Sequence, residues 1–233
     1  MGFIVAIDGE AGSGKSSTAK KVAEILGFTY IDTGAMFRCV TLELMRNNIG
    51  INEIGKIEEV LNKISINFKN DKDMQRVILN GVDVSEDIRT KKVDDKVAEY
   101  ATVGTIREKL KIIQQEMGRL GNIIMEGRDI GTVIFPNADV KLYIEVSEEE
   151  RAKRRYNQNL EKGITISYEE ILANIQKRHK LETEREIAPL VKAEDAILLD
   201  TTNITFEETT EEVVKIINKE WRKKYGTNIT RHI

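Results

Sequence analysis

Short apolar runs alternate with longer amphipathic stretches along most of the chain. The apolar runs have the length of buried strands, and helical patterns separate most of them, as in parallel strands joined by crossover helices. They cover residues Phe3–Ile7, Thr29–Ile31, Asn122–Met125, Val140–Val146 and Ala196–Leu199. We therefore expect an α/β fold of three layers, in which helices cover a parallel central sheet.

One region departs from this rhythm. Residues Ser65–Ile88 alternate between apolar and polar positions, and Asn80-Gly81 is a typical hairpin turn. The pattern predicts a small antiparallel insertion. Its role stays open at this point, because decoration of the fold, a dimer surface and a lobe that closes over a substrate are all compatible with it.

Three predicted helices have recognisable ends. Gly27 follows the amphipathic stretch SSTAKKVAEIL and is expected to form its C-terminal cap. Ser147 with Glu150, and Thr205 with Glu208, have the spacing of a capping box, so we expect a helix to begin at each pair.

The composition is that of a globular protein. Its 233 residues, 40% of them apolar, can bury one core, and 36 basic against 39 acidic residues give a net charge of -3 that does not indicate a nucleic-acid partner. The single cysteine, Cys39, excludes an internal disulfide and is expected to pack within a helix. No apolar run approaches the length of a membrane span and the N-terminus lacks a signal-peptide layout, so we expect a cytoplasmic protein without a membrane partner.

A glycine-rich segment directly follows the first apolar run. Its sequence, IDGEAGSGKSST, contains G-x-x-x-x-G-K-[ST] between a predicted strand and a predicted helix, which is typical of a phosphate-binding loop. Glycines let successive N–H groups turn inward around phosphate oxygens, and the helix adds the positive end of its dipole. We expect Lys15 to reach the β- and γ-phosphates of a nucleoside triphosphate, and Ser16 to bind Mg²⁺. The residues expected around the phosphates are Gly9, Glu10, Ala11, Gly12, Ser13, Gly14, Lys15, Ser16 and Ser17.

Two further loops follow predicted strands at the same edge of the sheet. DTGAMFR carries Arg38, and EGRDIGT carries Arg128 and Asp129. Ligands bind at the carboxyl ends of parallel strands, and arginine suits phosphate because it donates two parallel hydrogen bonds. Asp129 either pairs with the arginine or recognises a base or sugar hydroxyl. Both loops also have a purely structural interpretation: Thr33 would cap a helix in the first loop, and Arg128 and Asp129 would form a surface ion pair in the second.

Two charged stretches, residues 148–162 and 177–185, follow the fourth predicted strand. Such runs are usually solvated helix faces, but arginines can also close over a transferring phosphoryl group and stabilise its charge. The pattern favours a lid of this kind. Its basic residues include Arg151, Lys153, Arg154, Arg155, Arg178 and Arg185. The two histidines, His179 and His232, are isolated from other metal-type ligands, and we assign no chemistry to them.

Taken in order, five motifs make nearly the whole chain resemble the bacterial cytidylate kinases: IDGEAGSGKSST, IDTGAMFR, VILNGVDVSEDIR, EGRDIGTVIFP and EREIAPL. The resemblance implies a P-loop nucleoside monophosphate kinase fold and a monomer that transfers the γ-phosphoryl group of ATP to CMP, and to dCMP, with Mg²⁺. It implies a core of approximately residues 1–35, 110–150 and 190–225, an NMP-binding region of residues 36–109 with the insertion at 65–88, and a lid of residues 151–188.

The resemblance also implies roles for single residues. Lys15 and Ser16 match the contacts to the ATP phosphates and to Mg²⁺, and Thr33 stands near the pyrimidine. Catalytic roles are implied for Lys15, Arg128, Asp129, Arg178 and Arg185. Substrate contacts are implied for Asp32, Thr33, Gly34, Arg38, Arg107, Arg128, Asp129, Arg178, Glu182 and Arg185.

Two positions depart from the family pattern. Ala98 stands where the family often has serine, and Glu182 where it often has aspartate, and both positions are connected with the sugar. The ranking of ribose against deoxyribose is therefore open. Two rival functions also remain: another P-loop kinase acting on UMP, AMP or shikimate, and a nucleotide-dependent switch that transfers no phosphoryl group to a small molecule.

Overall fold

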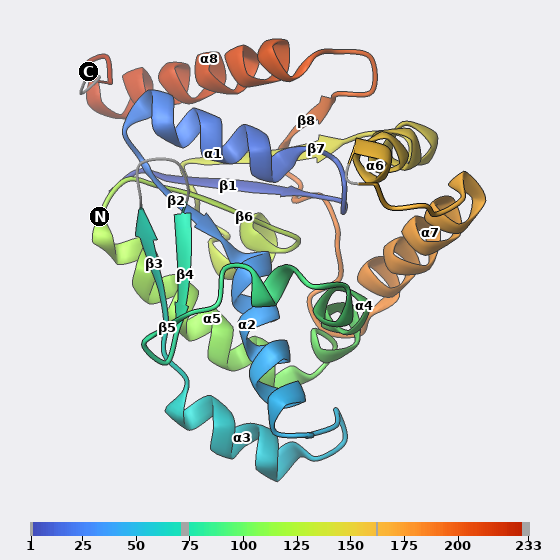
Figure 1. The fold of residues 1–233 in the computed structure, drawn as a ribbon. Coiled ribbons are helices and arrows are strands. Elements are labelled where there is room, and N and C mark those ends of the chain that lie inside the picture. The colour runs from blue at the N-terminus through green and yellow to red at the C-terminus, as the bar shows by residue number, and fades with distance from the viewer. Residues whose placement is uncertain (1, 71–74, 162, 230–233) are drawn as a thin grey trace. The chain divides into compact units, whose positions relative to one another are not determined.

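The computed structural model describes residues 2–70, 75–161 and 163–229. The chain divides into two compact units (Figure 1). The larger unit comprises the segment that ends at Tyr30 and the segment that starts at Gly118, and the smaller unit is Ile31–Met117. The predicted phosphate-binding loop and the charged stretches belong to the larger unit, and the predicted insertion belongs to the smaller one.

A five-stranded sheet forms in the part of the chain that the structure describes, with the strand order β2-β6-β1-β7-β8. Strand β1 pairs in parallel with both β6 and β7, and β7 pairs in parallel with β8. The strands are β1 (Ile4–Gly9), β2 (Thr29–Asp32), β6 (Ile123–Gly127), β7 (Val140–Glu145) and β8 (Ile197–Asp200). Each predicted apolar run corresponds to one of them, so the predicted α/β fold with a parallel central sheet is confirmed.

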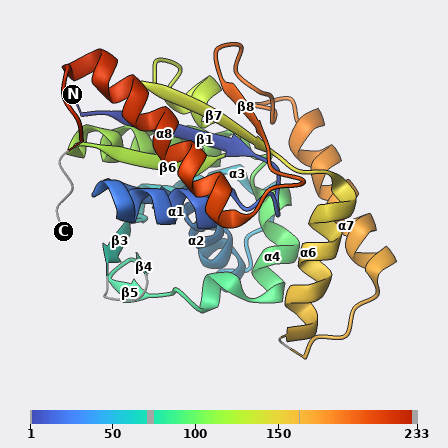
Figure 2. The same ribbon diagram turned by 90° about the horizontal axis from the view of Figure 1, so that it is seen from above.

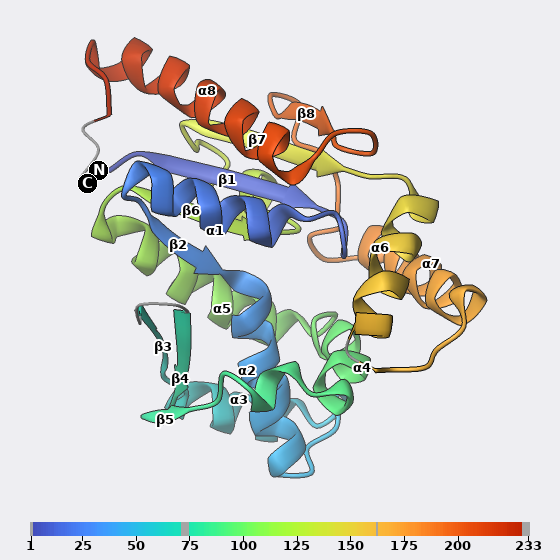
Figure 3. The same cartoon turned by 45° about the horizontal axis from the view of Figure 1, so that its top comes forward.

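Helices α1 (Lys15–Leu26) and α8 (Phe206–Tyr225) cover one face of this sheet (Figures 1 and 3). Their apolar side chains join those of β1, β6 and β7 in one buried cluster. Helix α1 ends as predicted at Gly27, whose φ of 68° lies in the left-handed region. Helix α8 begins with the predicted capping box of Thr205 and Glu208.

Helices α6 (Glu148–Glu161) and α7 (Tyr168–Glu184) pack side by side in the larger unit (Figure 2). The Ser147 hydroxyl accepts a hydrogen bond from the Glu150 N–H (3.2 Å), so the predicted helix start is confirmed. The carboxylate of Glu150 accepts from Nε of Arg154 (3.0 Å). The first charged stretch is therefore helical, and part of its charge is paired within the helix.

The smaller unit contains a three-stranded antiparallel sheet, β3-β4-β5, in its described residues. Its strands are β3 (Ile66–Asn70), β4 (Gln75–Leu79) and β5 (Val82–Asp83). Asn80 and Gly81 connect β4 to β5 with φ values of 51° and 86°, as a two-residue hairpin turn requires. The predicted antiparallel insertion is thus confirmed, although residues 71–74 within it lie outside the described residues.

Helices make up most of the rest of the smaller unit: α2 (Thr33–Arg46), α3 (Ile54–Lys63), α4 (Lys91–Tyr100), α5 (Gly104–Met117) and the short 3₁₀ turn Asp87–Arg89. Cys39 is buried in α2, as expected. The alternative that placed a helix cap at Thr33 is wrong by one residue. Asp32 is the cap, because its carboxylate accepts from the N–H of Ala35 (2.9 Å) and leaves Thr33 as the first helical residue.

The C-terminal segment follows α8. Gly226 caps this helix with a φ of 71°, and residues 230–233, which include His232, lie outside the described residues. Among the helices that the structure describes, none is both long enough and apolar enough to cross a bilayer.

Candidate active site

The segment from β1 to α1 has the backbone geometry of an anion-binding loop. Gly12 and Gly14 have φ values of 82° and 84°, left-handed conformations that turn neighbouring N–H groups inward. Gly9 is needed for a second reason, since a Cβ there would lie 2.3 Å from the carbonyl oxygen of Ile144. Gly14 is also the N-cap of α1, so the free N–H groups of the first helical turn begin at the loop. The Ser13 hydroxyl is buried without a hydrogen-bond partner among the described residues, which leaves a donor for an anion.

Lys15 lies buried at the start of α1, with 5% of its surface exposed. Its Nζ donates to the carbonyl oxygen of Glu10 (3.1 Å) and lies 3.8 Å from Oε2 of Glu126. Burial and the nearby positive charge of Arg128 lower the pKa of Lys15 to about 8, while Glu126 opposes this shift. An ammonium group in so little water gains more from a triphosphate than an exposed lysine would.

Ser16 and Glu126 place a hydroxyl oxygen and a carboxylate next to each other beside the loop. The Ser16 hydroxyl donates to Oε1 of Glu126 (2.7 Å), and the Tyr30 hydroxyl lies 3.4 Å from the same oxygen. Glu126 is buried at the end of β6. Mg²⁺ prefers oxygen ligands and usually takes only one or two from the protein, with substrate phosphates and water completing its shell. Among the described residues, no group of three or more His, Cys, Asp or Glu side chains could hold a metal ion. The Ser16–Glu126 pair offers two oxygen atoms, which fits a Mg²⁺ ion whose other ligands are phosphate oxygens and water.

Arg128 follows β6 and meets helix α7. Its Nε donates to Oε2 of Glu182 (2.7 Å), while Nε of Arg178 donates to Oε1 of the same carboxylate (2.9 Å). Burial alone would raise the pKa of Glu182, but the two guanidinium groups outweigh it and lower this pKa to about 2. Burial likewise tends to lower the pKa of Arg128, and Glu182 reverses this effect and raises it. The carboxylate of Glu182 therefore holds two guanidinium groups, one from the loop after β6 and one from α7.

Asp8, the residue before the phosphate-binding loop, holds the loop after Arg128 in place through two hydrogen bonds. Its two carboxylate oxygens accept from the N–H groups of Ile130 (2.8 Å) and Gly131 (2.7 Å). Burial raises the pKa of Asp8 to about 7, although the two N–H donors oppose this shift. Asp129 is also buried, and its Oδ1 lies 3.9 Å from Nη2 of Arg185. The acid of this loop therefore faces Arg185, and Arg128 faces Glu182, so the alternative of a surface pair between Arg128 and Asp129 is not what the structure has.

The smaller unit holds the remaining predicted residues. Nη2 of Arg38 lies 2.5 Å from Oδ1 of Asp94, and Nη1 donates weakly to the carbonyl oxygen of Ile88 (3.4 Å). Arg107 is buried, donates to the carbonyl oxygen of Ala101 (3.0 Å) and places its guanidinium over the ring of Phe37 at 5.3 Å. Asp32, Thr33 and Gly34 form the start of α2, and Ala98 lies on α4.

The larger unit therefore brings the predicted loop residues together with Arg128, Asp129, Arg178, Glu182 and Arg185. Sequence reasoning missed the roles of Asp8 and Glu126. Each ends or nearly ends a buried strand, and an acid at such a place is a signal that could have identified both. It also missed the contacts of Glu10 with Arg151 and His179, which join residues more than 140 positions apart.

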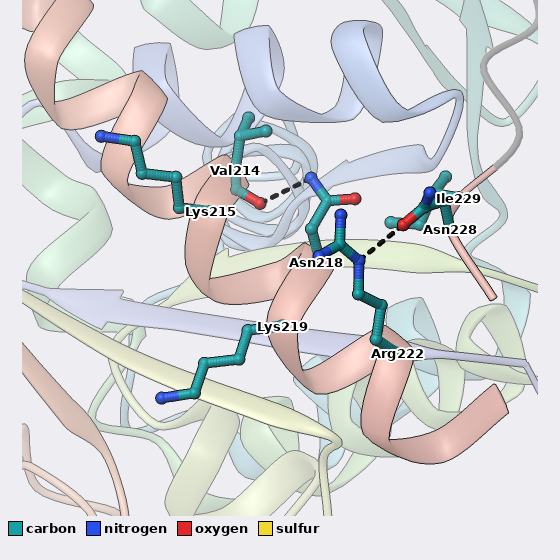
Figure 4. Close-up of a pocket in the computed structure, with 7 residues that line it drawn as sticks. All are labelled: Val214, Lys215, Asn218, Lys219, Arg222, Asn228 and Ile229. Carbon is teal, nitrogen blue, oxygen red and sulfur yellow. Dashed lines mark hydrogen bonds between the residues drawn. The ribbon is translucent and has the colours of Figure 1, made fainter. Parts of the chain in front are cut away.

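A separate hollow lies beside α8 and the segment that follows it (Figure 4). Nδ2 of Asn218 donates to the carbonyl oxygen of Val214 (2.9 Å), and Nε of Arg222 donates to Oδ1 of Asn228 (2.5 Å). The residues around the hollow are Val214, Lys215, Asn218, Lys219, Arg222, Asn228 and Ile229. None of them belongs to the predicted phosphate site, so this hollow is not part of the candidate active site.

Comparison with known proteins gives consistent results. A family model described as cytidylate kinase matches residues 5–219. A protein of Fusobacterium nucleatum named cytidylate kinase is 46% identical over 217 residues, which are 93% of this chain and 98% of that protein. A cytidylate kinase of Bacillus subtilis is 42% identical over 218 residues, or 94% and 97% of the two chains. A crystal structure of an uncharacterized protein from Eubacterium ventriosum aligns with a TM-score of 0.51 and 14% identity over 94% of this chain and 99% of that one, which shows a shared fold.

Proposed function

The chain belongs to the cytidylate kinase family and transfers the γ-phosphoryl group of ATP to CMP or dCMP, and we propose that the residues described above carry out this reaction. The observation that carries the proposal is the loop of residues 9–17, which combines left-handed glycines, a helix N-terminus and the buried ammonium group of Lys15. These features bind a polyphosphate in preference to a neutral ligand. Rival kinases with other acceptors, and a switch without phosphoryl transfer, are not favoured by the family match.

The donor occupies the loop in this proposal. Backbone N–H groups of residues 9–17 bind the phosphates, and Lys15 leaves its protein acceptors to hold the β- and γ-oxygens. Ser16, assisted by Glu126, holds Mg²⁺, which when bound neutralises charge on the β- and γ-phosphates. The acceptor phosphate is already an anion near neutral pH, so it needs alignment and charge neutralisation more than a general base.

We assign the acceptor to arginines and other polar side chains. Those that follow β6 or lie on and after α7 are Arg128, Asp129, Arg178, Glu182 and Arg185. The others are Asp32, Thr33, Gly34, Arg38 and Arg107, and Arg38, Arg107 and Arg128 hold the CMP phosphate. The lateral oxygens of the transferring group meet Arg178 and Arg185, which exclude water when the helices close.

The functional regions follow from these roles. We assign a core of approximately residues 1–35, 110–150 and 190–225, an NMP-binding region of residues 36–109 with the insertion at 65–88, and a lid of residues 151–188. The enzyme acts as a cytoplasmic monomer on small-molecule substrates, with neither nucleic acid nor membrane as partner. Glu182 and Ala98 set the ratio of dCMP to CMP turnover, since a changed hydrogen bond to a sugar hydroxyl alters discrimination by about 1 kcal/mol.

The test is ADP formation from Mg-ATP with CMP, dCMP, UMP and AMP supplied separately, with the product diphosphates separated by chromatography. We expect CDP from CMP, with UMP and AMP as poor acceptors. Lys15→Met should abolish turnover while the protein stays folded. Lys20→Met is the matched control, because Lys20 is exposed on the same helix. If folded Lys15→Met protein kept full turnover, the proposed role of Lys15 and its loop in the reaction would be refuted. If the protein bound ATP but phosphorylated none of the four acceptors, the nucleotide-dependent switch would be favoured instead.

A further inference from the structure

The segment after Arg128 has an unusual backbone. Residues Ile130–Ile134 form a single π-helical turn, in which the N–H of Phe135 donates to the carbonyl oxygen of Ile130 (2.7 Å). The carbonyl oxygen of Asp129 accepts from the N–H groups of Val133 (2.9 Å) and Ile134 (3.2 Å), so the backbone of Asp129 is part of the same turn. Turns of this kind are rare and occur frequently at functional sites.

Asp8 on β1 supplies the acceptors for the start of this π-turn. The first N–H groups of a helical turn have no acceptor within it. Here those of Ile130 and Gly131 donate to Oδ1 (2.8 Å) and Oδ2 (2.7 Å) of Asp8, which is 5% exposed. Hydrogen bonds to an ionised acceptor are roughly twice as strong as neutral ones. Asp8 also precedes Gly9 and pairs with Gly127 at the end of β6, so one side chain lies between the phosphate-binding loop and the π-turn.

The π-turn is closely packed at both ends. A Cβ on Gly131 would lie 3.4 Å from Oδ2 of Asp8 and 3.2 Å from Cδ of Lys141 on β7. Lys141 is buried, and its Nζ donates to both carboxylate oxygens of Asp195 (2.8 Å each), so its position is also fixed. At the other end, a Cβ on Gly118 would lie 2.3 Å from the ring of Phe135. The π-turn therefore has little room to move toward other acceptors when the carboxylate of Asp8 is lost.

The charge of Asp8 and its hydrogen bonds have opposite effects on an anionic acceptor. The carboxylate lies close enough to Arg128 and Asp129 to interact with both charges. A negative charge beside Arg128 weakens the attraction of the site for a phosphate, so by its charge alone Asp8 would oppose acceptor binding. Its two hydrogen bonds favour binding, because they fix the backbone that carries Arg128 and Asp129. Removal of the charge therefore separates the two effects by their sign.

We propose that Asp8 is a positioning residue for the acceptor nucleotide, which acts through its two hydrogen bonds to the π-turn and so aligns Arg128 and Asp129. The proposal rests on the proposed function, since it assumes that these two residues contact CMP. Asparagine has the size of aspartate but offers one acceptor oxygen to two donors, so it leaves one buried N–H unpaired. A misplacement of about 1 Å at a positioned group costs about 100-fold in rate.

The experiment measures kcat and the KM for CMP, together with the Kd of Mg-ATP without CMP, for the full chain and its variants. Asp8→Asn should lower kcat/KM for CMP by about 100-fold and leave the Kd of Mg-ATP unchanged. Asp8→Glu, which keeps the charge but displaces both acceptor oxygens by one methylene group, should change the same quantities in the same direction. Asp139→Asn is the matched control. Asp139 accepts from the N–H of Ile4 at the opposite end of β1 (2.8 Å) and from Nζ of Lys224 (2.6 Å), so its loss should lower stability in urea but leave the kinetics unchanged.

Three results would overturn the assignment of Asp8. Tighter CMP binding by Asp8→Asn, with Asp8→Glu like the wild type, would show that only the charge matters. An equal loss of ATP affinity would show that Asp8 merely supports the structure of both loops, and an equal loss of CMP turnover in Asp139→Asn would show that any destabilised β1 has this effect. Wild-type protein that binds ATP but does not phosphorylate CMP would refute the proposed function, and this inference with it. Normal turnover by the wild type with any of the three results refutes the inference alone.

Discussion

Glu182 offers the sharpest test of how charge is arranged at the candidate site. Its carboxylate lies between Arg128 and Arg178 and is 7% exposed. Against the tendency of burial to raise it, the two guanidinium groups lower the pKa of Glu182 from the usual 4.5 to about 2. A pKa shift of this size adds about 3 kcal/mol to the free energy of unfolding, because one pKa unit corresponds to about 1.4 kcal/mol.

The sign of the pH dependence follows from the direction of this shift. Between the unfolded and the folded pKa of Glu182 the unfolded state binds more protons, so stability rises with pH across that interval. The contribution of Glu182 is therefore complete above pH 4.5 and is lost as the pH falls toward 2. Glu182→Gln, which cannot ionise, should lose about 3 kcal/mol at neutral pH and progressively less below pH 4.5.

Urea denaturation of the wild type and of Glu182→Gln at several pH values from 3 to 7 measures this difference. At neutral pH the melting temperature should also fall by about 6–12 °C, the usual scale for a chain of this size. Glu184→Gln is the matched control, since Glu184 lies on the same helix, is exposed and lies 4.0 Å from Lys180. A Glu182→Gln protein as stable as the wild type at pH 7, or a difference that does not change with pH, would refute the reasoning.

Two further predictions concern the loop and the last helix. Gly9→Ala places a Cβ 2.3 Å from a backbone carbonyl oxygen, so we expect a loss of about 3 kcal/mol or more and failure to bind ATP, measured by denaturation and calorimetry. Gly55→Ala, where nothing lies within 4 Å of the new Cβ, should be tolerated, and equal effects of the two would contradict the steric argument. Thr205→Ala removes the hydroxyl that accepts from the Glu208 N–H (3.2 Å) and should cost about 1 kcal/mol in urea denaturation, whereas Thr227→Ala beyond the helix should not. An unchanged midpoint for Thr205→Ala would show that the capping box is not needed.

Much of the fold could be predicted because local patterns carry it. The apolar runs gave every strand of the parallel sheet, and Asn80-Gly81 gave a turn of the antiparallel insertion, since both signals depend only on neighbouring residues. The error at Thr33 was of the same local kind. Asp32 and Thr33 can both cap a helix, and only the folded backbone shows which N–H group each side chain reaches.

Distant contacts account for what the sequence did not show at the candidate site. Asp8 fastens a loop 122 residues away, and Ser16 donates to Glu126 across 110 residues. Burial also depends on the fold, since the pKa of Lys15 falls and that of Asp8 rises mainly because the folded chain removes both side chains from water.

The sequence by itself determined the α/β class, the phosphate-binding loop and the family, because periodicity and fixed spacings such as G-x-x-x-x-G-K-[ST] are properties of the chain. Tertiary structure alone decided how the charges pair. Arg128 donates to Glu182, which is 54 residues away, and Nη2 of Arg151 lies 3.0 Å from the carboxylate of Glu10. The physical reason is that a charge buried in a protein must find its partner wherever the fold brings one near, and the partner's position in the chain does not enter the energy.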